Sequence, residues 1–315
     1  MRDLKARRHD QGEAMNATTV AVLTSWSLQP AVIAGLLLAA GLYLAGWRRR
    51  QRHSRRAGLP AWRAWCYLLG LATVALALLS PIATFGAALF FMHMIEHLLL
   101  LLVAPPLLWL GSPLLPLLWA FPRDERRALG RLFQRDHPVH RVFHVLTDAR
   151  VAAPIFLLTV GIWHLPGFYD AAEGMTVTHG LEHALFFVTA LLYWWPVVHP
   201  TGGRRRLGYG MSLLYLFLAN IEGIVIGAPL AFSTHMLYTY YAQVPRVMSL
   251  SALADQQLGG LLMWVAPHVL WLVVLQVILL RWFKAETCNE EEIERAYAAR
   301  QSAPLAAPPP DRPAA

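Results

Sequence analysis

Residues 87–110 read AALFFMHMIEHLLLLLVAPPLLWL and determine the class of fold that the chain can adopt. Such a run of mostly apolar residues is long enough to cross a bilayer as one helix, which takes about 20 residues. Further segments of the same character lie at roughly 30–47, 63–80, 151–165, 178–198, 209–228 and 258–282. None of them alternates polar and apolar residues as a barrel strand does. We therefore predict an all-α polytopic membrane bundle of about seven transmembrane helices.

The composition of the whole chain agrees with a membrane protein. Of the 315 residues, 57% are hydrophobic and only 15% are charged, which excludes a soluble globular enzyme and a disordered protein. The two cysteines, Cys66 and Cys288, are too few for a disulfide framework. The net charge of +8 comes from short basic clusters between apolar segments. That pattern indicates membrane topology rather than a nucleic-acid-binding surface.

Alternate connections between the predicted spans carry most of the positive charge. Of the 27 lysine and arginine residues, 22 lie in the connections at 48–63, 123–150 and 204–206 and in the C-terminal tail. The positive-inside rule then places the N-terminus outside and the C-terminus in the cytoplasm. The second of these connections also predicts a short amphipathic helix around 123–134 that contacts lipid headgroups, with a plain basic loop as the alternative.

The N-terminal segment departs from this charge pattern, because it would carry four basic residues outside: Arg2, Lys5, Arg7 and Arg8. Met15 is an alternative start, which would leave residues 1–14 untranslated; otherwise the short tail is translocated despite its charge. We divide the chain into an N-terminal tail at 1–29, a seven-span membrane domain at 30–283 and a cytoplasmic, largely disordered tail at 284–315.

Two spans contain the same histidine motif. His93–His97 reads HMIEH and His179–His183 reads HGLEH, so both are His-x-x-Glu-His. Residues four apart lie on one face of a helix, so each histidine pair points in one direction. The glutamate projects about 100° away from the second histidine, toward a neighbouring helix. Trp109 and Trp195 each follow the first histidine of their motif by 16 residues, which favours an old duplication of a helical hairpin.

Ionisable side chains inside a membrane are costly and usually functional, so the motifs predict a metal site or a proton-handling site; hydrogen bonding between packed helices is the alternative. Imidazole suits zinc, copper and iron. The predicted ligands are His93, His97, His179 and His183. Glu96 and Glu182 would orient the rings without binding the ion, and His164, His268 and Glu222 are auxiliary candidates. Ligand rings must be neutral, so metal affinity should fall below pH ~6.5.

Other residues in the spans carry structural predictions. We expect Glu222 to be interior and paired, with a histidine of another span as one candidate partner. Asp255 is expected to be a helix N-cap. Pro105 and Pro106 should kink or end the third helix. Close helix packing is predicted at four glycines: Gly223, Gly227, Gly259 and Gly260.

Several stretches together resemble the CtaG family, the multi-span cytochrome c oxidase assembly factors of bacteria. They are HMIEHLLLLLVAPPLLWLGSPLLPL, WHLPGFYDAA, HGLEHALFFVTALLYWWPV and DQQLGGLLMWV with the preceding LYTYYA. The resemblance covers about residues 30 to 283. It implies a role in the biogenesis of a haem–copper terminal oxidase, with suspected copper handling. The motif positions that it marks are His93, Glu96, His97, His164, Asp170, His179, Glu182, His183, Asp255 and Gln256.

These observations favour a non-enzymatic assembly factor whose partners are haem–copper oxidase subunits and the lipid bilayer. It would bind or deliver copper, or alternatively zinc, at the periplasmic leaflet, where imidazole ligands tolerate an oxidising compartment better than thiols. A copper or proton transporter is the alternative, although the cytoplasmic halves of the two motif spans are almost purely apolar. Inverted zinc proteases share the motif, but two copies in a seven-span chain argue against an intramembrane zinc enzyme. We assign no catalytic residue and no organic cofactor.

Overall fold

The computed structural model describes residues 24–53, 59–132, 134, 136–198, 207–246 and 249–302, and these segments contain helices and no strand. The predicted all-α fold is therefore confirmed for this part of the chain. The alternative start at Met15, the arginines at 204–206 and the end of the chain from residue 303 lie outside the described residues, as do Arg55, Arg56 and Arg135. Two compact units are formed, one by residues up to Trp271 and one from Leu272 onward.

Within the residues that the structure describes, six helical segments are long and apolar enough to cross a membrane. They are α2 (Pro30–His53), α3 with α4 (Ala61–Leu79 and Pro81–Gly86), α5 with η1 and α6 (Phe90–Leu98, Leu99–Val103 and Ala104–Leu110), α12 (Thr176–Val198), α13 (Tyr209–Phe232) and α15 (Ala252–Ser302). The span predicted at 151–165 is α10 (Ala149–Trp163), which has only 15 residues. It reaches the required length only with α9 (Pro138–Leu146), and the two are bent by 64°. Six spans, or seven with this bent pair, agree with the prediction of about seven.

The third span is irregular where its prolines predicted a disturbance. Between α5 and α6 the five residues of η1 form a π-helical turn. Pro105 and Pro106 lack the N–H groups that would bond to carbonyls of the preceding turn. A single π-turn absorbs such a defect without ending the helix. The predicted break in the regular helix is confirmed. The first histidine motif lies in α5, the short α-helical segment that precedes the π-helical turn.

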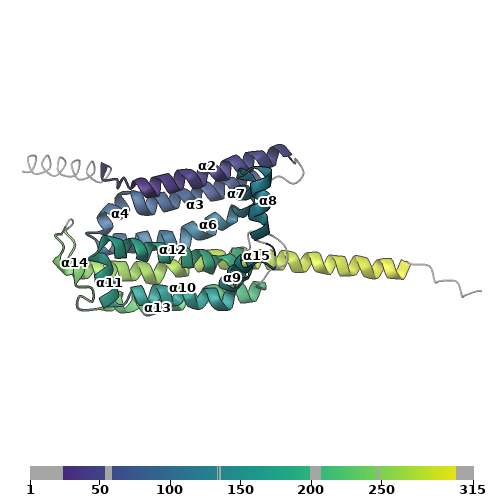
Figure 1. Cartoon of the computed structure of the whole chain (residues 1–315). Helices are drawn as coiled ribbons and strands as arrows, with labels where there is room; N and C mark the ends of the chain where they lie inside the picture. Colours follow the sequence, from purple (N-terminus) through teal and green to yellow (C-terminus); the bar gives the residue numbers. More distant parts are fainter. Residues whose placement is uncertain are drawn as a thin grey trace, which may run out of the picture. The chain divides into compact units, whose positions relative to one another are not determined.

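Short helices lie at both ends of the first unit (Figure 1). At one end are α4, α11 (Pro166–Glu173) and α14 (Tyr240–Gln243), and at the other are α7 (Leu114–Ala120), α8 (Arg123–Leu132) and α9. The predicted helix around 123–134 is α8, which has no buried residue. Arg49 ties α2 to α7 by donating to the carbonyl of Ala120 at 2.7 Å. The arginines of α8 and of the end of α2 thus lie at one end of this unit, and α4, which leads into α5, lies at the other.

Helix α13 packs closely on the first part of α15 through glycines. A Cβ added at Gly227 would lie 2.6 Å from the carbonyl oxygen of Gly260, and one at Gly260 would lie 2.5 Å from the backbone nitrogen of Ala231. Both distances are shorter than van der Waals contact, so only glycine fits at these positions. The predicted close packing at Gly223, Gly227, Gly259 and Gly260 is confirmed.

The second unit contains the remainder of α15. Residues 284–302, which we expected to be largely disordered, are helical. Their sequence is rich in glutamate, alanine and arginine, which have high helix propensity. Glu291 and Arg295 form an ion pair of 2.9 Å one turn apart, which adds to helix stability. The expectation of disorder was therefore wrong for residues 284–302.

Candidate metal centre

The two histidine motifs meet at the interface between α5 and α12. His93 Nε2 lies 3.2 Å from His183 Nε2. The ring centres of His97 and His183 are 5.1 Å apart, and those of His93 and His179 are 5.0 Å apart. His93 and His97 are 1% and 0% exposed, whereas the side chain of His179 is 29% exposed. The structure thus brings together all four histidines that the sequence predicted as ligands.

The two motif spans also contact each other near their C-terminal ends, away from the histidines. Trp109 and Trp195, the equivalent residues after each motif, contact each other edge to face with ring centres 4.7 Å apart. The indole of Trp109 donates to the carbonyl of Leu191 at 2.8 Å, and that of Trp194 donates to the carbonyl of Leu101 at 3.0 Å. These contacts hold the two spans in register, so the two motifs stay at the same depth.

Each motif glutamate faces a histidine of the other motif. Glu96 Oε1 lies 3.5 Å from His183 Nδ1, and Glu182 Oε1 lies 3.9 Å from His97 Nε2. Glu96 and Glu182 are 3% and 0% exposed. The predicted direction of the glutamates, toward the neighbouring helix, is confirmed, and the arrangement is reciprocal.

Of the two auxiliary histidines, only His164 joins the cluster. It follows α10, and its ring centre lies 5.6 Å from that of His97. Its Nδ1 donates to the carbonyl of Val160 at 2.8 Å, which leaves Nε2 with a free lone pair. His268 instead bonds to the carbonyl of Trp264 in its own helix at 2.6 Å. In the described part of the chain, no hydrogen bond, ion pair or ring contact joins His268 to the cluster.

Three residues of the cluster were not predicted from the sequence. Glu173 of α11 has its Oε1 atom 2.7 Å from His93 Nδ1 and 4.0 Å from His179 Nε2. Tyr169 of α11 and Tyr241 of α14 place their hydroxyls 2.7 Å and 3.2 Å from the same His93 nitrogen. Burial raises the pKa of the Glu173 carboxyl, but His93 and His179 lower it more, so the net pKa lies below its usual value. Tyr169 and Glu173 are four residues apart in the sequence, a spacing that indicates one helical face.

Two predicted acids and a glutamine position the elements around the cluster. Asp255 was expected to cap the helix that it begins, but its carboxylate accepts from the backbone N–H groups of Phe90 and Phe91, both at 3.0 Å, and so caps α5. Asp170 accepts from the backbone N–H of Thr239 at 3.1 Å. Gln256 accepts from the backbone N–H of Leu237 at 2.7 Å. These contacts fix the loop that carries Tyr241.

The cluster contains buried polar atoms that lack hydrogen-bond partners among the described residues. They are both ring nitrogens of His97, Nε2 of His164, Nε2 of His179 and both carboxylate oxygens of Glu182. Because buried polar groups are almost always paired, such a group indicates a bound water or ion. In the described residues, no lysine or arginine pairs with Glu96, Glu173 or Glu182. Three buried carboxylates therefore have only histidines to balance their charge, which favours a cation.

The donor atoms of the cluster lie close enough together that they could hold a metal ion. One donor atom each from His93, His97 and His183 lies within 4.8 Å of the others, and so does one each from His93, Glu173, His179 and Glu182. The 3.2 Å between the Nε2 atoms of His93 and His183 matches two nitrogens bound tetrahedrally at about 2.0 Å from one ion. The residues present therefore fit a metal ion of borderline softness, such as copper or zinc.

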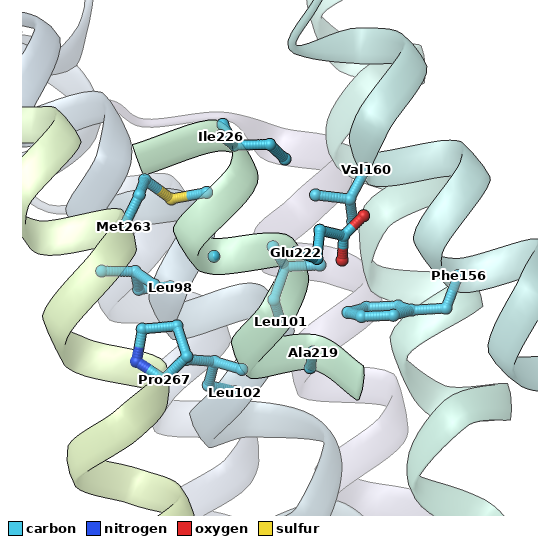
Figure 2. A pocket seen from close by; sticks show the side chains of 11 residues that line it. Leu98, Leu101, Leu102, Phe156, Val160, Ala219, Glu222, Ile226, Met263 and Pro267 are labelled. Atoms are coloured by element: carbon cyan, nitrogen blue, oxygen red, sulfur yellow. The ribbon is translucent and has the colours of Figure 1, made fainter. Parts of the chain in front are cut away.

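Glu222 lies away from the histidines, in a small apolar cavity (Figure 2). The cavity holds about 30 Å³, enough for one water molecule, and its lining includes Leu98, Phe156, Val160 and Met263. The Glu222 carboxylate points between Val160 and Phe156. No ion pair joins it to a histidine in the described part of the chain. The residue is half-buried, so the predicted interior position is found only in part, and the predicted histidine partner is not found among the described residues.

A cleft of about 800 Å³ opens beside the cluster. Its lining includes the polar residues Ser27, Gln29 and Thr84 and aliphatic side chains of α2, α3 and α12. Glu96, His179 and His183 also line it. The cleft thus gives the histidine motifs a route to the outside of the bundle.

Comparison with known proteins identifies the family. The cytochrome c oxidase caa3 assembly factor family matches residues 41–285 of the chain. Uncharacterised proteins of Mycobacterium bovis and Mycobacterium tuberculosis are each 28% identical to it over 273 residues, and one of Mycobacterium leprae is 26% identical over 280 residues. These alignments cover 85% of the chain but only 41% of each relative, so the chain spans less than half the length of the relatives that it matches. No solved structure matches the chain.

Proposed function

The chain belongs to the cytochrome c oxidase caa3 assembly factor family, and from that premise we propose that it binds copper in the histidine cluster and delivers it to a haem–copper oxidase during assembly. His93, His97, His179 and His183 are the proposed ligands, with His164 as an additional imidazole. In this proposal copper is delivered to the oxidase and is not a cofactor for a reaction of this chain.

The observation that carries the proposal is the set of unpartnered donors around His97. Both nitrogens of this ring are buried without a hydrogen bond, and Nε2 of the adjacent His164 is in the same state. Leaving such groups unpaired costs about 1–3 kcal/mol each, so packing alone gives no reason to bury several of them together. An ion bound by these nitrogens would remove that cost.

The chemistry of the donors favours copper and leaves zinc as the alternative. Imidazoles bind both ions, and first-row affinities generally rank copper above zinc. His164 donates its Nδ1 proton to a backbone carbonyl, a contact that fixes the tautomer in which Nε2 is free to bind a metal. Glu96 and Glu182, which face His183 and His97, would hold these rings in orientation and balance the charge of the ion.

The proposed side of the membrane follows from the distribution of charge. The arginines of α8 and of the end of α2 lie at the end of the first unit opposite the start of α5. If that basic end is cytoplasmic, the histidine cluster lies in the outer leaflet. An assembly factor with this orientation would present copper on the periplasmic side of the inner membrane.

Metal analysis of the purified full chain tests the proposal. Wild-type protein loaded with Cu⁺ and passed over a desalting column should retain the ion, and the variants His93→Ala/His97→Ala and His179→Ala/His183→Ala should not. Retention should weaken below pH ~6.5, because protons compete for imidazole nitrogens. A parallel loading with Zn²⁺ identifies the preferred ion. Wild-type protein that retains neither ion would contradict the proposal.

A further inference from the structure

We propose that the cluster contains two metal positions in series that share His93, an outer one that receives the ion and an inner one that holds it. This inference rests on the proposed metal-binding function and adds a direction of transfer to it. The outer position consists of His93, Glu173, His179 and Glu182, and the inner one of His93, His97 and His183. Within each set, one donor atom per residue lies within 4.8 Å of the others.

The two nitrogens of His93 face different sides of the cluster. Nε2 lies 3.2 Å from His183 Nε2 in the inner set, and Nδ1 lies 2.7 Å from Glu173 Oε1 in the outer set. The ring therefore contacts both sets without a change of rotamer. A neutral ring has a free lone pair on one nitrogen only, so as the ion passes from Nδ1 to Nε2 the ring proton leaves Nε2 and a proton is bound at Nδ1, where Glu173 Oε1 at 2.7 Å accepts its hydrogen bond. The other ligands of each set hold the ion during this exchange.

The two positions differ in access. The side chain of His179 is 29% exposed and lines the cleft, whereas His97 is 0% exposed. Next to His97 are His164, at 5% exposure, and Phe186, whose ring centre lies 4.8 Å from that of His97. The cleft is lined by His179 and also by His183 of the inner set, whereas His97 does not line it. An ion arriving through the cleft therefore meets His179 before it reaches His97, so the set that contains His179 is the receiving one.

The donor chemistry of the two sets also differs. Glu173 and Glu182 give the outer set two buried carboxyl groups, whose negative charge stabilises a bound cation. The inner set offers only imidazoles, and the unpartnered Nε2 of His164 faces it from the end of α10. An ion that moves from the first set to the second therefore exchanges carboxylate ligands for neutral nitrogens.

X-ray absorption of the full chain loaded with one equivalent of Cu⁺ distinguishes the two positions. Wild type should show nitrogen ligands only. His97→Ala removes only an inner ligand, so this variant should retain copper in a mixed nitrogen and oxygen environment. Glu173→Gln removes only an outer ligand, so it should keep the nitrogen-only spectrum but load copper roughly 10-fold more slowly. Glu291→Gln, on the exposed part of α15, is the matched control and should load as wild type does.

The failure of this inference differs from the failure of the proposed function. If wild type binds copper but His97→Ala binds none, the cluster is a single site and the serial arrangement is wrong. The same follows if Glu173→Gln loads copper at the wild-type rate. If wild type itself binds no copper, the proposed function fails and this inference fails with it.

Discussion

Glu96 of α5 faces His183 of α12 across the interface of the motif spans, 3.5 Å from its Nδ1 atom, and Glu182 repeats the relationship with His97 at 3.9 Å. The repeat of the motif in the sequence thus becomes a reciprocal arrangement in space. Each helix supplies histidines to the cluster and a carboxylate to the other helix. Both glutamates are almost fully buried, at 3% and 0% exposure, and each faces the opposite ring.

Glu96→Gln and Glu182→Gln should each weaken copper binding by roughly 10–100-fold, because the opposite ring loses the charged group that orients it. Competition with a Cu⁺ chelator of known affinity measures this loss. The two substitutions should have effects of similar size, since the contacts are reciprocal. An unchanged affinity in both variants would show that the carboxylates do not influence the rings.

Gly227→Ala should destabilise the protein, because the added Cβ would lie 2.6 Å from the carbonyl oxygen of Gly260 and force α13 away from α15. The expected loss is about 1–3 kcal/mol of unfolding free energy, seen as a lower midpoint in thermal unfolding of the purified protein.

Gly35→Ala is the matched control for this packing test, because nothing lies within 4 Å of its added Cβ. Alanine has the higher helix propensity, so this variant should be as stable as wild type or slightly more stable. Equal stability of both alanine variants would contradict the packing role of Gly227.

Much of the site was predictable because it depends on helical periodicity. The spacing of His93 and His97 fixes one face of α5, and that of His179 and His183 fixes one face of α12, whatever the rest of the chain does. Apolar length likewise predicted the spans, although α10 has only 15 residues and reaches the required length only together with α9.

The rest of the site depends on contacts between distant segments. Tyr241 reaches His93 because Gln256 and Asp170 hold its loop, and no local pattern reveals such pairings. Asp255 stands at the start of one helix but caps another, 165 residues away in the chain. The four-residue spacing of Tyr169 and Glu173 predicts that both lie on one face of α11. The sequence does not show that this face contacts α5, so the spacing alone could not identify Glu173 as part of the site.

Glu222→Gln should preserve the fold and reduce the amount of active oxidase. An isolated carboxylate in hydrocarbon costs at least ~2.5 kcal/mol, so retaining one in an apolar cavity indicates a function that the isosteric amide lacks. Oxidase activity in membranes, normalised to the amount of this protein, is the measurement. Wild-type oxidase levels in the variant would contradict this prediction and show that Glu222 has only a packing role.

A reporter enzyme that is active only in the periplasm should be silent when fused after Arg300, because the predicted orientation places the C-terminus in the cytoplasm. The same reporter inserted after Ser249, in the loop before α15, should be active and serves as the control. Activity of the C-terminal fusion would reverse the orientation and move the histidine cluster to the cytoplasmic leaflet.

Replacement of His93 and His97, or of His179 and His183, by alanine should leave the protein in the membrane at normal amounts but yield a terminal oxidase that lacks copper. Each pair supplies two of the proposed ligands. Neither α5 nor α12 contains another histidine that could replace them, so loss of either pair removes the site. The decisive measurements are the copper content and activity of the oxidase in cells grown under copper limitation. Added copper should restore part of the activity, because a high external concentration partly replaces a delivery factor. If both double variants assemble a fully active oxidase under copper limitation, the histidines have only a packing role and the metal-site hypothesis is wrong.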